Sequence, residues 1–133
     1  ADDEAAARSH AVPFIGVVAA PRAWTTRSGA LRAAHEADLS VRMLSSGNPH
    51  RAIPVTSALC VAVAARTPGT LPHACVGAGS GPLRIGHASG TILVEAETEA
   101  ATGEVLHASV YRTARRLFQG EVLVPSPPTP TVP

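Results

Sequence analysis

The chain has 133 residues, enough for one domain with a modest core. Its apolar fraction of 45% and charged fraction of 16% are typical of a globular protein, and its net charge of +1 predicts neither a nucleic-acid-binding patch nor a membrane-surface patch. All eleven basic residues are arginine, so the chain has no lysine to act as a base or to form a Schiff base.

The first half of the chain predicts one strand and then two helices. Residues 12–19 form a short β-branched run bounded by prolines, which predicts a buried strand. Apolar positions spaced through residues 30–44 favour a helix, most strongly over 36–44. A second helix is predicted over residues 52–65, with Pro54 tolerated in its first turn. Because this helix has almost no polar side chain, we expect it to lie buried at the centre of the domain.

The second half predicts mainly β-structure. Glycines and prolines in residues 71–82 indicate a loop. Strands are predicted at residues 83–85, 91–97 and 105–111, with a hairpin turn at 101–104. A short turn or helix is predicted at 112–120, a last strand at 121–124, and a disordered proline-rich tail at 126–133. The predicted class is α+β, with strands wrapped around one buried helix.

The start of the chain and its cysteine content predict a cytoplasmic protein. No stretch approaches the roughly 18 consecutive apolar residues of a membrane helix, and residues 1–9 open with acidic side chains, the reverse of a signal peptide. Cys60 and Cys75 are then expected to be free thiols, with a disulfide between them as the minor alternative. The scattered histidines and the single cysteine pair give no metal-binding spacing, so no metal and no other cofactor is predicted.

The segment Ser45–Arg51 is the strongest candidate site that spacing alone provides. It joins the two predicted helices and ends near the start of the apolar one, where free backbone N–H groups bind anions such as carboxylates. Ser45 and Ser46 offer hydroxyls, Gly47 permits a close backbone approach, and His50 adds a hydrogen-bonding group. The alternative interpretation is a helix stop at Ser46-Gly47-Asn48 with His50 as a capping side chain.

An ordered series of short motifs resembles the PrpF-like isomerase family. No single motif is specific, but their order and spacing across residues 12–125 are hard to produce by chance. The matching segments are Phe14-Ile15-Gly16-Val17-Val18, Ser45-x-Gly47-x-x-His50-x-Ala52, Val55-Thr56-x-Ala58-x-Cys60, Arg84-Ile85-Gly86-His87-x-Ser89-Gly90, Val94-Glu95-Ala96-Glu97 and Tyr111-Arg112-Thr113-Ala114-Arg115-Arg116-Leu117-x-x-Gly120.

The resemblance implies one half of a diaminopimelate-epimerase-like fold, a curved β-sheet around a buried central helix. Residues 1–11 would be an N-terminal extension or truncated lead-in, and residues 12–125 the C-terminal domain portion of the isomerase. The implied activity is a cofactor-independent double-bond shift in a small unsaturated polycarboxylate such as methylaconitate or aconitate. The lysine and cysteine that serve as acid–base candidates in the family's N-terminal half have no counterpart here. The expected partners are therefore the substrate and a missing N-terminal half, with a homodimer left open and no nucleic acid or membrane.

The same resemblance assigns substrate contacts residue by residue. Ser45, Ser46, Gly47 and His50 match the segment that faces the substrate, and His87 and Ser89 match a turn that either contacts substrate or only joins strands. Arg112, Arg115 and Arg116 resemble a polycarboxylate clamp, although salt bridges to Glu95, Glu97 or Glu104 are the favoured interpretation. Cys60 is expected in the core.

Two other functions stay open at this point. The first is an inactive remnant or a binding or assembly module, since the family's proton-transferring groups are missing. The second is an amino-acid racemase or epimerase of the same fold. Residues 45–53 contain no cysteine, which argues against a two-cysteine racemase.

Overall fold

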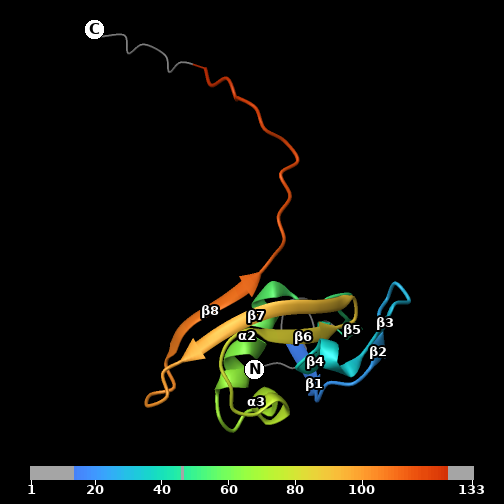
Figure 1. The fold of residues 1–133 in the computed structure, drawn as a ribbon, viewed down its shortest axis with the longest axis vertical. Coiled ribbons are helices and arrows are strands. Elements are labelled where there is room, and N and C mark those ends of the chain that lie inside the picture. Colours follow the sequence, from blue (N-terminus) through green and yellow to red (C-terminus); the bar gives the residue numbers. More distant parts are fainter. Residues whose placement is uncertain (1–13, 46, 126–133) are drawn as a thin grey trace, which may run out of the picture.

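The computed structural model describes residues 14–45 and 47–125, which form a curled β-sheet with helices against one face (Figure 1). The sheet has six strands in the order β1-β4-β6-β7-β8, with β5 paired to β4. A separate two-stranded hairpin is formed by β2 and β3. In chain order the elements are β1 (Phe14–Ala19), β2 (Trp24–Thr25), β3 (Leu31–Arg32), the 3-10 helix η1 (Ala34–Glu36), β4 (Leu39–Ser45), β5 (Asn48–Pro49), α2 (Val55–Arg66), α3 (Leu71–Val76), β6 (Leu83–His87), β7 (Gly90–Thr98) and β8 (Val105–Tyr111).

The sheet is mostly antiparallel, with one parallel pair at its centre. β4 and β6 run parallel, with Leu39 opposite Ile85, and the chain between them passes through α2 and α3. A parallel pair needs such a crossover, because its two strands start at the same edge of the sheet. β6, β7 and β8 follow as antiparallel neighbours. The predicted α+β class and the three C-terminal strands are therefore confirmed.

The core lies between α2 and the concave side of the sheet. Ala58, Ala62 and Ala65 are 0–1% exposed and recur at helical spacing. Their small side chains let the helix axis approach the strands closely. The sheet contributes alternate residues, as its two-residue period requires. These are Leu39, Val41 and Met43 of β4, Leu83 and Ile85 of β6, and Ile92, Val94 and Ala96 of β7.

The helix predicted at residues 30–44 is wrong, because this segment contains β3, η1 and the central strand β4. In β4, Leu39, Val41 and Met43 are buried while the residues between them are only partly buried. That alternation has a period of two, and the same apolar positions also fit a helical template over a short window. Pairing with strands on both sides selects the strand.

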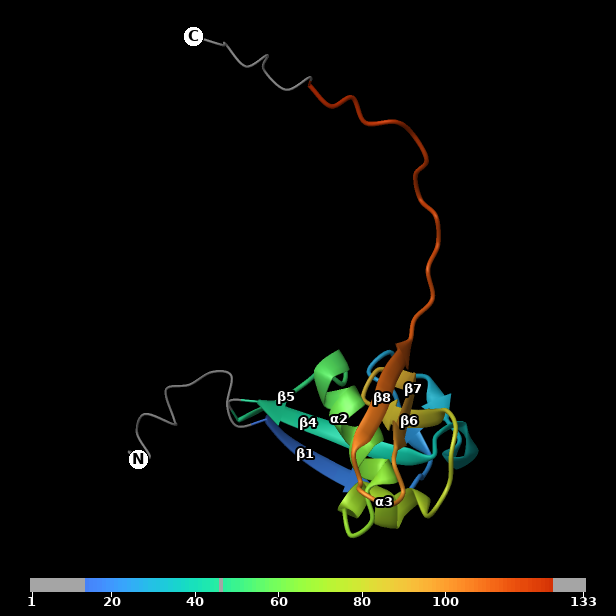
Figure 2. The same cartoon turned by 90° about the vertical axis from the view of Figure 1, so that its left-hand side faces the viewer.

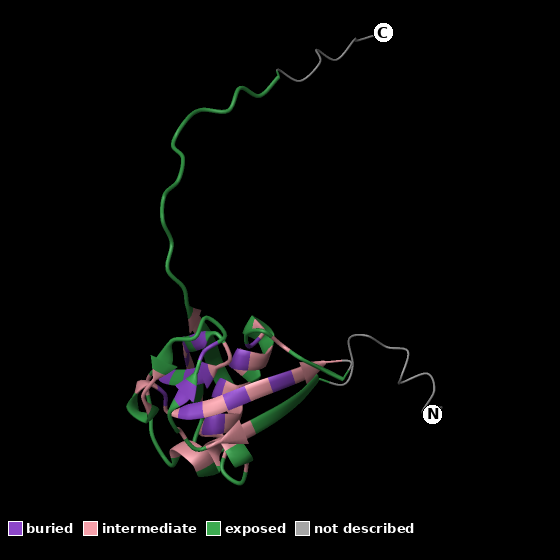
Figure 3. Cartoon of the chain, turned by 90° about the vertical axis from the view of Figure 1, so that its right-hand side faces the viewer, coloured by how far each residue is buried: buried purple, intermediate pink, exposed green. Residues whose placement is uncertain are grey.

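The strand predicted at residues 12–19 exists as β1, but the prediction that it is buried is wrong. Phe14, Ile15 and Val17 are 48%, 55% and 58% exposed. Among the described strands, β1 pairs only with β4, so it forms the edge of the described sheet. Figure 3 shows the alternately buried β4 beside the mostly exposed β1. A β-branched run predicts a strand, but it does not tell a central strand from an edge strand.

The predicted second helix is confirmed as α2, but a helix buried on all sides is not confirmed. Only its alanine face is buried against the sheet, while Val55 and Cys60 are exposed. The prediction that Cys60 belongs to the core is therefore wrong. The loop predicted at 71–82 contains a helix, α3, whose first turn is capped by Thr70 Oγ1 accepting a hydrogen bond from the His73 N–H at 3.2 Å.

Residues 112–125 leave the end of β8 as an extended segment that runs away from the domain (Figures 1 and 2). The predicted turn or helix at 112–120 and the predicted strand at 121–124 are both absent from this described segment. A strand needs a neighbour for its backbone groups, and none of the described strands lies beside this segment. The expected lead-in at residues 1–11 and the expected tail at 126–133 lie outside the described residues.

Trp24 of the hairpin β2–β3 packs over Gly86 near the end of β6, on the face of the strand opposite to that of the core residue Ile85. The indole Nε1 donates a hydrogen bond to the His87 carbonyl at 3.1 Å. Gly86 makes room for the ring, because a Cβ there would lie 3.1 Å from Ala37 Cβ and 3.2 Å from Trp24 Cη2. The Arg27 N–H also donates to the Ala88 carbonyl at 2.8 Å. The hairpin thus holds the turn that follows His87.

Candidate functional site

The segment Ser45–Arg51 is a tight strand connection rather than a link between helices. Ser45 ends β4 and lies opposite Asn48 of β5. Gly47 has a φ of +74°, a left-handed conformation that glycine adopts without strain. The His50 N–H donates to the Met43 carbonyl at 2.8 Å and closes the connection. α2 begins only at Val55, so the predicted direct junction with a helix N-terminus is wrong, and so is the alternative of a helix stop. Ser46 lies outside the described residues.

His50 combines a fixed ring with an unsatisfied nitrogen. Its imidazole stacks on Phe14 of β1, with ring centroids 5.4 Å apart and an angle of 22° between the planes. Its Nε2 is buried and has no hydrogen-bond partner among the described residues. A buried polar atom without a hydrogen-bond partner lowers the stability of the fold by on the order of 1–3 kcal/mol. A hydrogen bond from Nε2 to a group outside these residues would remove that loss.

The turn between β6 and β7 is tied to this segment. The Ser89 hydroxyl donates a hydrogen bond to the Arg51 carbonyl. Ser89 also donates its backbone N–H to His87 Nδ1 at 3.2 Å, which orients the imidazole. The two segments that the resemblance singled out are distant in sequence and meet here. His50, just after β5, and His87, at the end of β6, therefore lie on segments that the bond between Ser89 and Arg51 connects, just before α2 in the case of His50.

Positive charge gathers beside His87. Arg42 is partly buried, and its Nη1 donates to the carbonyls of Val41 at 2.8 Å and Gly86 at 3.2 Å. Burial and the charge of Arg22 lower the pKa of Arg42. Burial and then the charge of Arg42 lower the pKa of His87 from its ordinary value of 6.5, against a weaker opposite effect of the hydrogen bond that the imidazole donates to the Thr91 backbone. The lowered pKa favours the neutral form of His87 beside the charge of Arg42.

A cavity of about 340 Å³ opens next to His87. Ala52 and Ile53, just before α2, form one wall, and Thr91, Tyr111 and Arg112 form another. Tyr111 is held there by its hydroxyl, which donates a hydrogen bond to the Glu95 carboxylate. That bond, and then burial and the charge of Glu95, raise the pKa of Tyr111.

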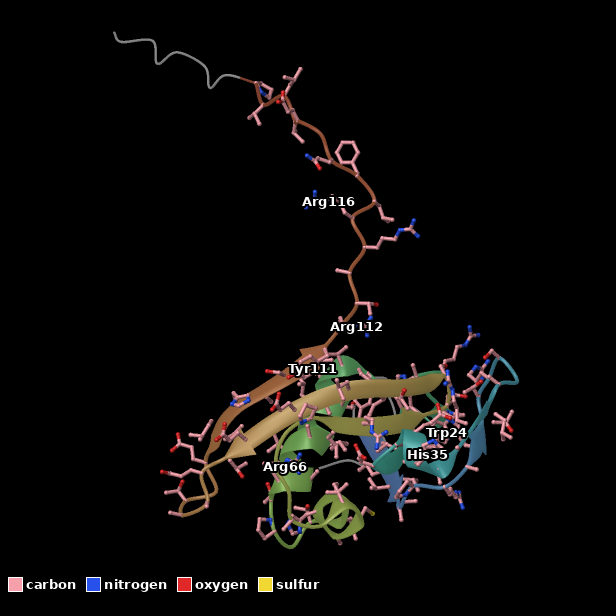
Figure 4. The ribbon with its side chains drawn as sticks, viewed as in Figure 1. Trp24, His35, Arg66, Tyr111, Arg112 and Arg116 are labelled. Carbon is pink, nitrogen blue, oxygen red and sulfur yellow. The ribbon has the colours of Figure 1, made fainter. Side chains whose placement is uncertain are left out.

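The three C-terminal arginines are not brought together. Arg112 lines the cavity at the end of β8, whereas Arg116 lies out on the extended segment (Figure 4). Arg116 Nη1 donates to Gln119 Oε1 at 3.0 Å. Within residues 14–45 and 47–125, the predicted salt bridges from these arginines to Glu95, Glu97 or Glu104 are absent; Glu97 instead lies 3.5 Å from His107 Nδ1.

Sequence reasoning missed Arg42 and Phe14 as neighbours of the candidate site. The period-two pattern of residues 39–45 could have identified Arg42 as a side chain on the opposite face from Val41, but that segment was predicted as a helix. No sequence signal pairs Phe14 with His50, because the contact depends on the register of β1 against β4.

In the part of the chain that the structure describes, no group of three or more His, Cys, Asp or Glu side chains could hold a metal ion. No described helix has the length and hydropathy that crossing a membrane requires.

Comparisons with known proteins match the motifs and the fold. A sequence model of the PrpF protein family matches residues 1–125. A 2-methyl-aconitate isomerase of Shewanella oneidensis is 43% identical over 94% of this chain and 32% of its own length. A 3-methylitaconate isomerase of Eubacterium barkeri is 32% identical over 92% of this chain and 33% of its own. A solved crystal structure of a methylitaconate-delta-isomerase superposes with a TM-score of 0.74 and 31% identity, covering 88% of this chain and 30% of that one.

The fold and the matched sequence define a mixed α+β protein similar to isomerases of small unsaturated carboxylic acids. The chain belongs to the PrpF family. It spans about a third of the length of the curated relatives that it matches. The resemblance read from the motifs is therefore confirmed.

Proposed function

We propose that this chain forms the substrate-binding part of a cofactor-independent isomerase that moves a double bond in a small unsaturated polycarboxylate. The observation that carries the proposal is the family match over residues 1–125, with relatives named 2-methyl-aconitate isomerase and 3-methylitaconate isomerase. The joined loops at His50 and His87 and the positive charge beside them support a site for a carboxylate substrate.

The proposed reaction is a proton transfer within an allylic system. A base removes a proton from the carbon next to the double bond, the electron pair delocalises toward a carboxylate, and a proton returns at the far end of the allyl unit. No atom is gained or lost. The intermediate carries extra negative charge, which fixed hydrogen-bond donors and cations can stabilise without a cofactor.

In this proposal, the residues of the chain bind and orient the substrate. The unsatisfied Nε2 of His50 would donate to one carboxylate, since the stack on Phe14 fixes the direction of the ring. Ser45, Ser46 and Gly47 would line the same subsite. His87 and Ser89 would face a second carboxylate, near the charge of Arg42.

The proton-transferring groups are not assigned to this chain. It contains no lysine, and Cys60 and Cys75 lie on α2 and α3 rather than on the segments that carry His50 and His87. The chain also spans about a third of its relatives, so we expect these groups on the part of the family fold that it does not contain. The isolated 133-residue chain should then show no isomerase activity.

A chimera tests the proposal. The region of the Shewanella oneidensis isomerase that aligns with this chain is replaced by residues 1–133, and the ultraviolet absorbance of the conjugated acid follows turnover. His50→Ala should lower kcat/KM by about ten- to a hundredfold, the effect of losing a hydrogen bond to a charged group. His50→Gln, which keeps a donor near Nε2, should recover part of this loss. Ser45→Ala should have a similar but smaller effect.

Matched controls separate binding from folding. His107→Ala and Ser109→Ala change the same residue types on β8, away from the candidate site, and should leave kcat/KM unchanged. Isomerase activity from the isolated chain would contradict the proposal that the proton-transferring groups lie outside it. A folded chimera with no activity on any conjugated di- or tricarboxylate would favour a binding or assembly role instead.

A further inference from the structure

A second cavity, of about 570 Å³, lies at the other end of the domain from the candidate site. Its walls come from η1, the end of α2, α3 and the start of β6, and they include His35, Arg66, Ser80 and Arg84. α2 begins just after the segment at His50 and ends at Arg66, and its twelve residues span about 18 Å. β6 likewise runs from this cavity to His87. Figure 4 accordingly shows Arg66 well apart from Arg112, which lines the cavity beside His87.

Arg66 brings a positive charge to the wall of this second cavity. Among the residues that the structure describes, it forms no ion pair with a carboxylate. Asp38 lines the same cavity, but both of its carboxylate oxygens already accept hydrogen bonds from Arg84. Burial raises the pKa of Asp38 and its bonds to Arg84 lower it, while the charge of Arg66 contributes least. The charge of Arg66 is therefore not neutralised by a described side chain.

The end of α2 does not use this charge either. Arg66 lies in the last turn, where a cation could bond to the free carbonyl groups of the helix. Those carbonyls already accept hydrogen bonds from three hydroxyl groups, those of Thr67, Thr70 and Thr98. Arg66 Nη2 donates instead to the Gly81 carbonyl at 2.6 Å, and its Nε is buried without a hydrogen-bond partner among the described residues. The guanidinium group thus has donors that the described chain leaves unused.

The loop between α3 and β6 places more donors beside the same guanidinium group. Three of residues 77–81 are glycine, and the first and last of them have φ values of +73° and +82°. The N–H groups of residues 78–80 and the Ser80 hydroxyl make no hydrogen bond to another described residue. The loop lies against Arg66, because a Cβ at Gly79 would be 3.7 Å from Arg66 Nη1. Successive free N–H groups in a turn form a concave surface that suits an anion.

We propose that this cavity binds a small oxyanion, a carboxylate or a phosphate, between the guanidinium group of Arg66 and the loop at residues 77–81. A guanidinium group presents parallel N–H donors that match two oxygens of such an anion. The N–H groups of the loop and the Ser80 hydroxyl would donate to the remaining oxygens. The site lies at the opposite end of α2 from His50, so an anion bound here would not compete with the substrate of the proposed isomerase.

Titration of the isolated chain tests the proposal, with sodium phosphate in one series and sodium succinate in another at constant ionic strength. The backbone amide NMR signals of residues 78–80 should shift and saturate, with a dissociation constant of roughly millimolar size. The anion with the lower dissociation constant shows whether the site prefers a phosphate or a carboxylate. Shifts that fail to saturate with either anion would mean a general ionic effect only and would overturn the proposal.

Two variants locate the bound anion. Arg66→Gln removes the cation and should weaken binding by about tenfold or more. Because it also removes the bond to the Gly81 carbonyl, a second variant changes only an exposed residue of the loop. Ser80→Asp adds a carboxylate there and should abolish binding without changing the melting temperature. The control Gln119→Asp adds the same charge on the extended segment and should leave the dissociation constant unchanged. A folded Ser80→Asp variant that binds as the parent does would show the proposal to be wrong.

The chimera with the Shewanella oneidensis isomerase tests the site in a chain of full family length. Calorimetric titration with the preferred anion should give a dissociation constant similar to that of the isolated chain. Loss of binding in a folded chimera would mean that another part of the family fold fills the cavity, and the proposal would fail. Neither titration depends on turnover, so an inactive chimera that still binds the anion would count against the proposed isomerase function alone.

Discussion

Strands β1 and β4 are paired along six residues, and β1 is the more apolar of the two, yet β4 is far more deeply buried. β4 lies between β1 and β6 and packs its alternate side chains on α2, so Leu39 and Val41 are 0–1% exposed. β1 has one described neighbour, so even Val18, which lies opposite Val41 on the core side, is only partly buried, and Val17 on the other face is 58% exposed. The difference shows that apolar content makes a strand, whereas the position of the strand in the sheet decides how much that content stabilises the fold.

Leu39 and Val17 give the largest expected contrast. Leu39→Ala removes a fully buried side chain from the contact between β4 and α2 and should lower the free energy of unfolding by about 2–5 kcal/mol. Val17→Ala on β1 should change it by less than about 0.5 kcal/mol. Urea unfolding of the isolated chain measures both. Equal losses would mean that β1 is buried in solution, which would break the comparison.

Gly86 tests the other side of the central strands. A Cβ at this position would approach Ala37 Cβ at 3.1 Å and Trp24 Cη2 at 3.2 Å, so Gly86→Ala forces the indole outward. We expect a loss of about 1–3 kcal/mol and a shift of tryptophan fluorescence toward that of exposed indole. In the matched control Gly79→Ala, the nearest atom would be Arg66 Nη1 at 3.7 Å, an ordinary contact. An unchanged fluorescence spectrum in Gly86→Ala would show that the β2–β3 hairpin does not cover β6.

An ion pair fastens β4 to β6, and it should make the central pair sensitive to acid. Asp38 accepts hydrogen bonds from the Arg84 backbone N–H and Nη2, each at 2.7 Å. Burial alone would raise the pKa of Asp38, but the hydrogen bonds from Arg84 outweigh it and lower the pKa below its ordinary value of 3.8. This stabilisation is therefore complete above about pH 4 and is lost as the pH falls through the lowered pKa of the folded state.

The size of this effect is limited, because the side chains of Arg84 and Asp38 are 46% and 31% exposed. Asp38→Asn should lower the free energy of unfolding at pH 7 by about 1 kcal/mol or less and should flatten its decline below pH 4. Glu121→Gln removes a carboxylate from the extended segment at residues 112–125. It should change neither the free energy of unfolding at pH 7 nor its decline below pH 4. If the free energy of unfolding of Asp38→Asn still falls below pH 4 as it does in the parent, other carboxylates cause the pH dependence.

The sequence predicted the class, the C-terminal strands and the family, because these depend on local periodicity and on the order of the motifs. It misassigned β4, since Leu39, Val41 and Met43 satisfy both a strand and a helix over a short window. It predicted that β1 and Cys60 are buried, and both predictions are wrong, because burial depends on which elements pack beside them. For the candidate site, it singled out the segments at His50 and His87 but not their connection through Ser89 and Arg51, which depends on how the strands pair.

Helix α2 repeats the contrast between β4 and β1 within a single element, and its cysteine gives the smallest expected effect. Ala62 faces the sheet and is 1% exposed, whereas Cys60 lies on the exposed side of the same helix. Cys60→Ser should therefore change the free energy of unfolding by less than about 0.5 kcal/mol. Ala62→Ser would bury a hydroxyl against the core and should cost about 1–3 kcal/mol.

Thiol labelling of the native chain resolves the same difference without unfolding it. Cys75 packs against the core and is partly buried, so a disulfide reagent should reach Cys60 first, by about tenfold in rate. Cys60→Ser should remove the fast phase and leave the slow one. A single slow phase in the parent would mean that another surface covers this side of α2 in the isolated chain. Because Phe14, Gly16 and Val18 of β1 border the same groove as Cys60, that result would predict that this face of β1 is protected together with Cys60.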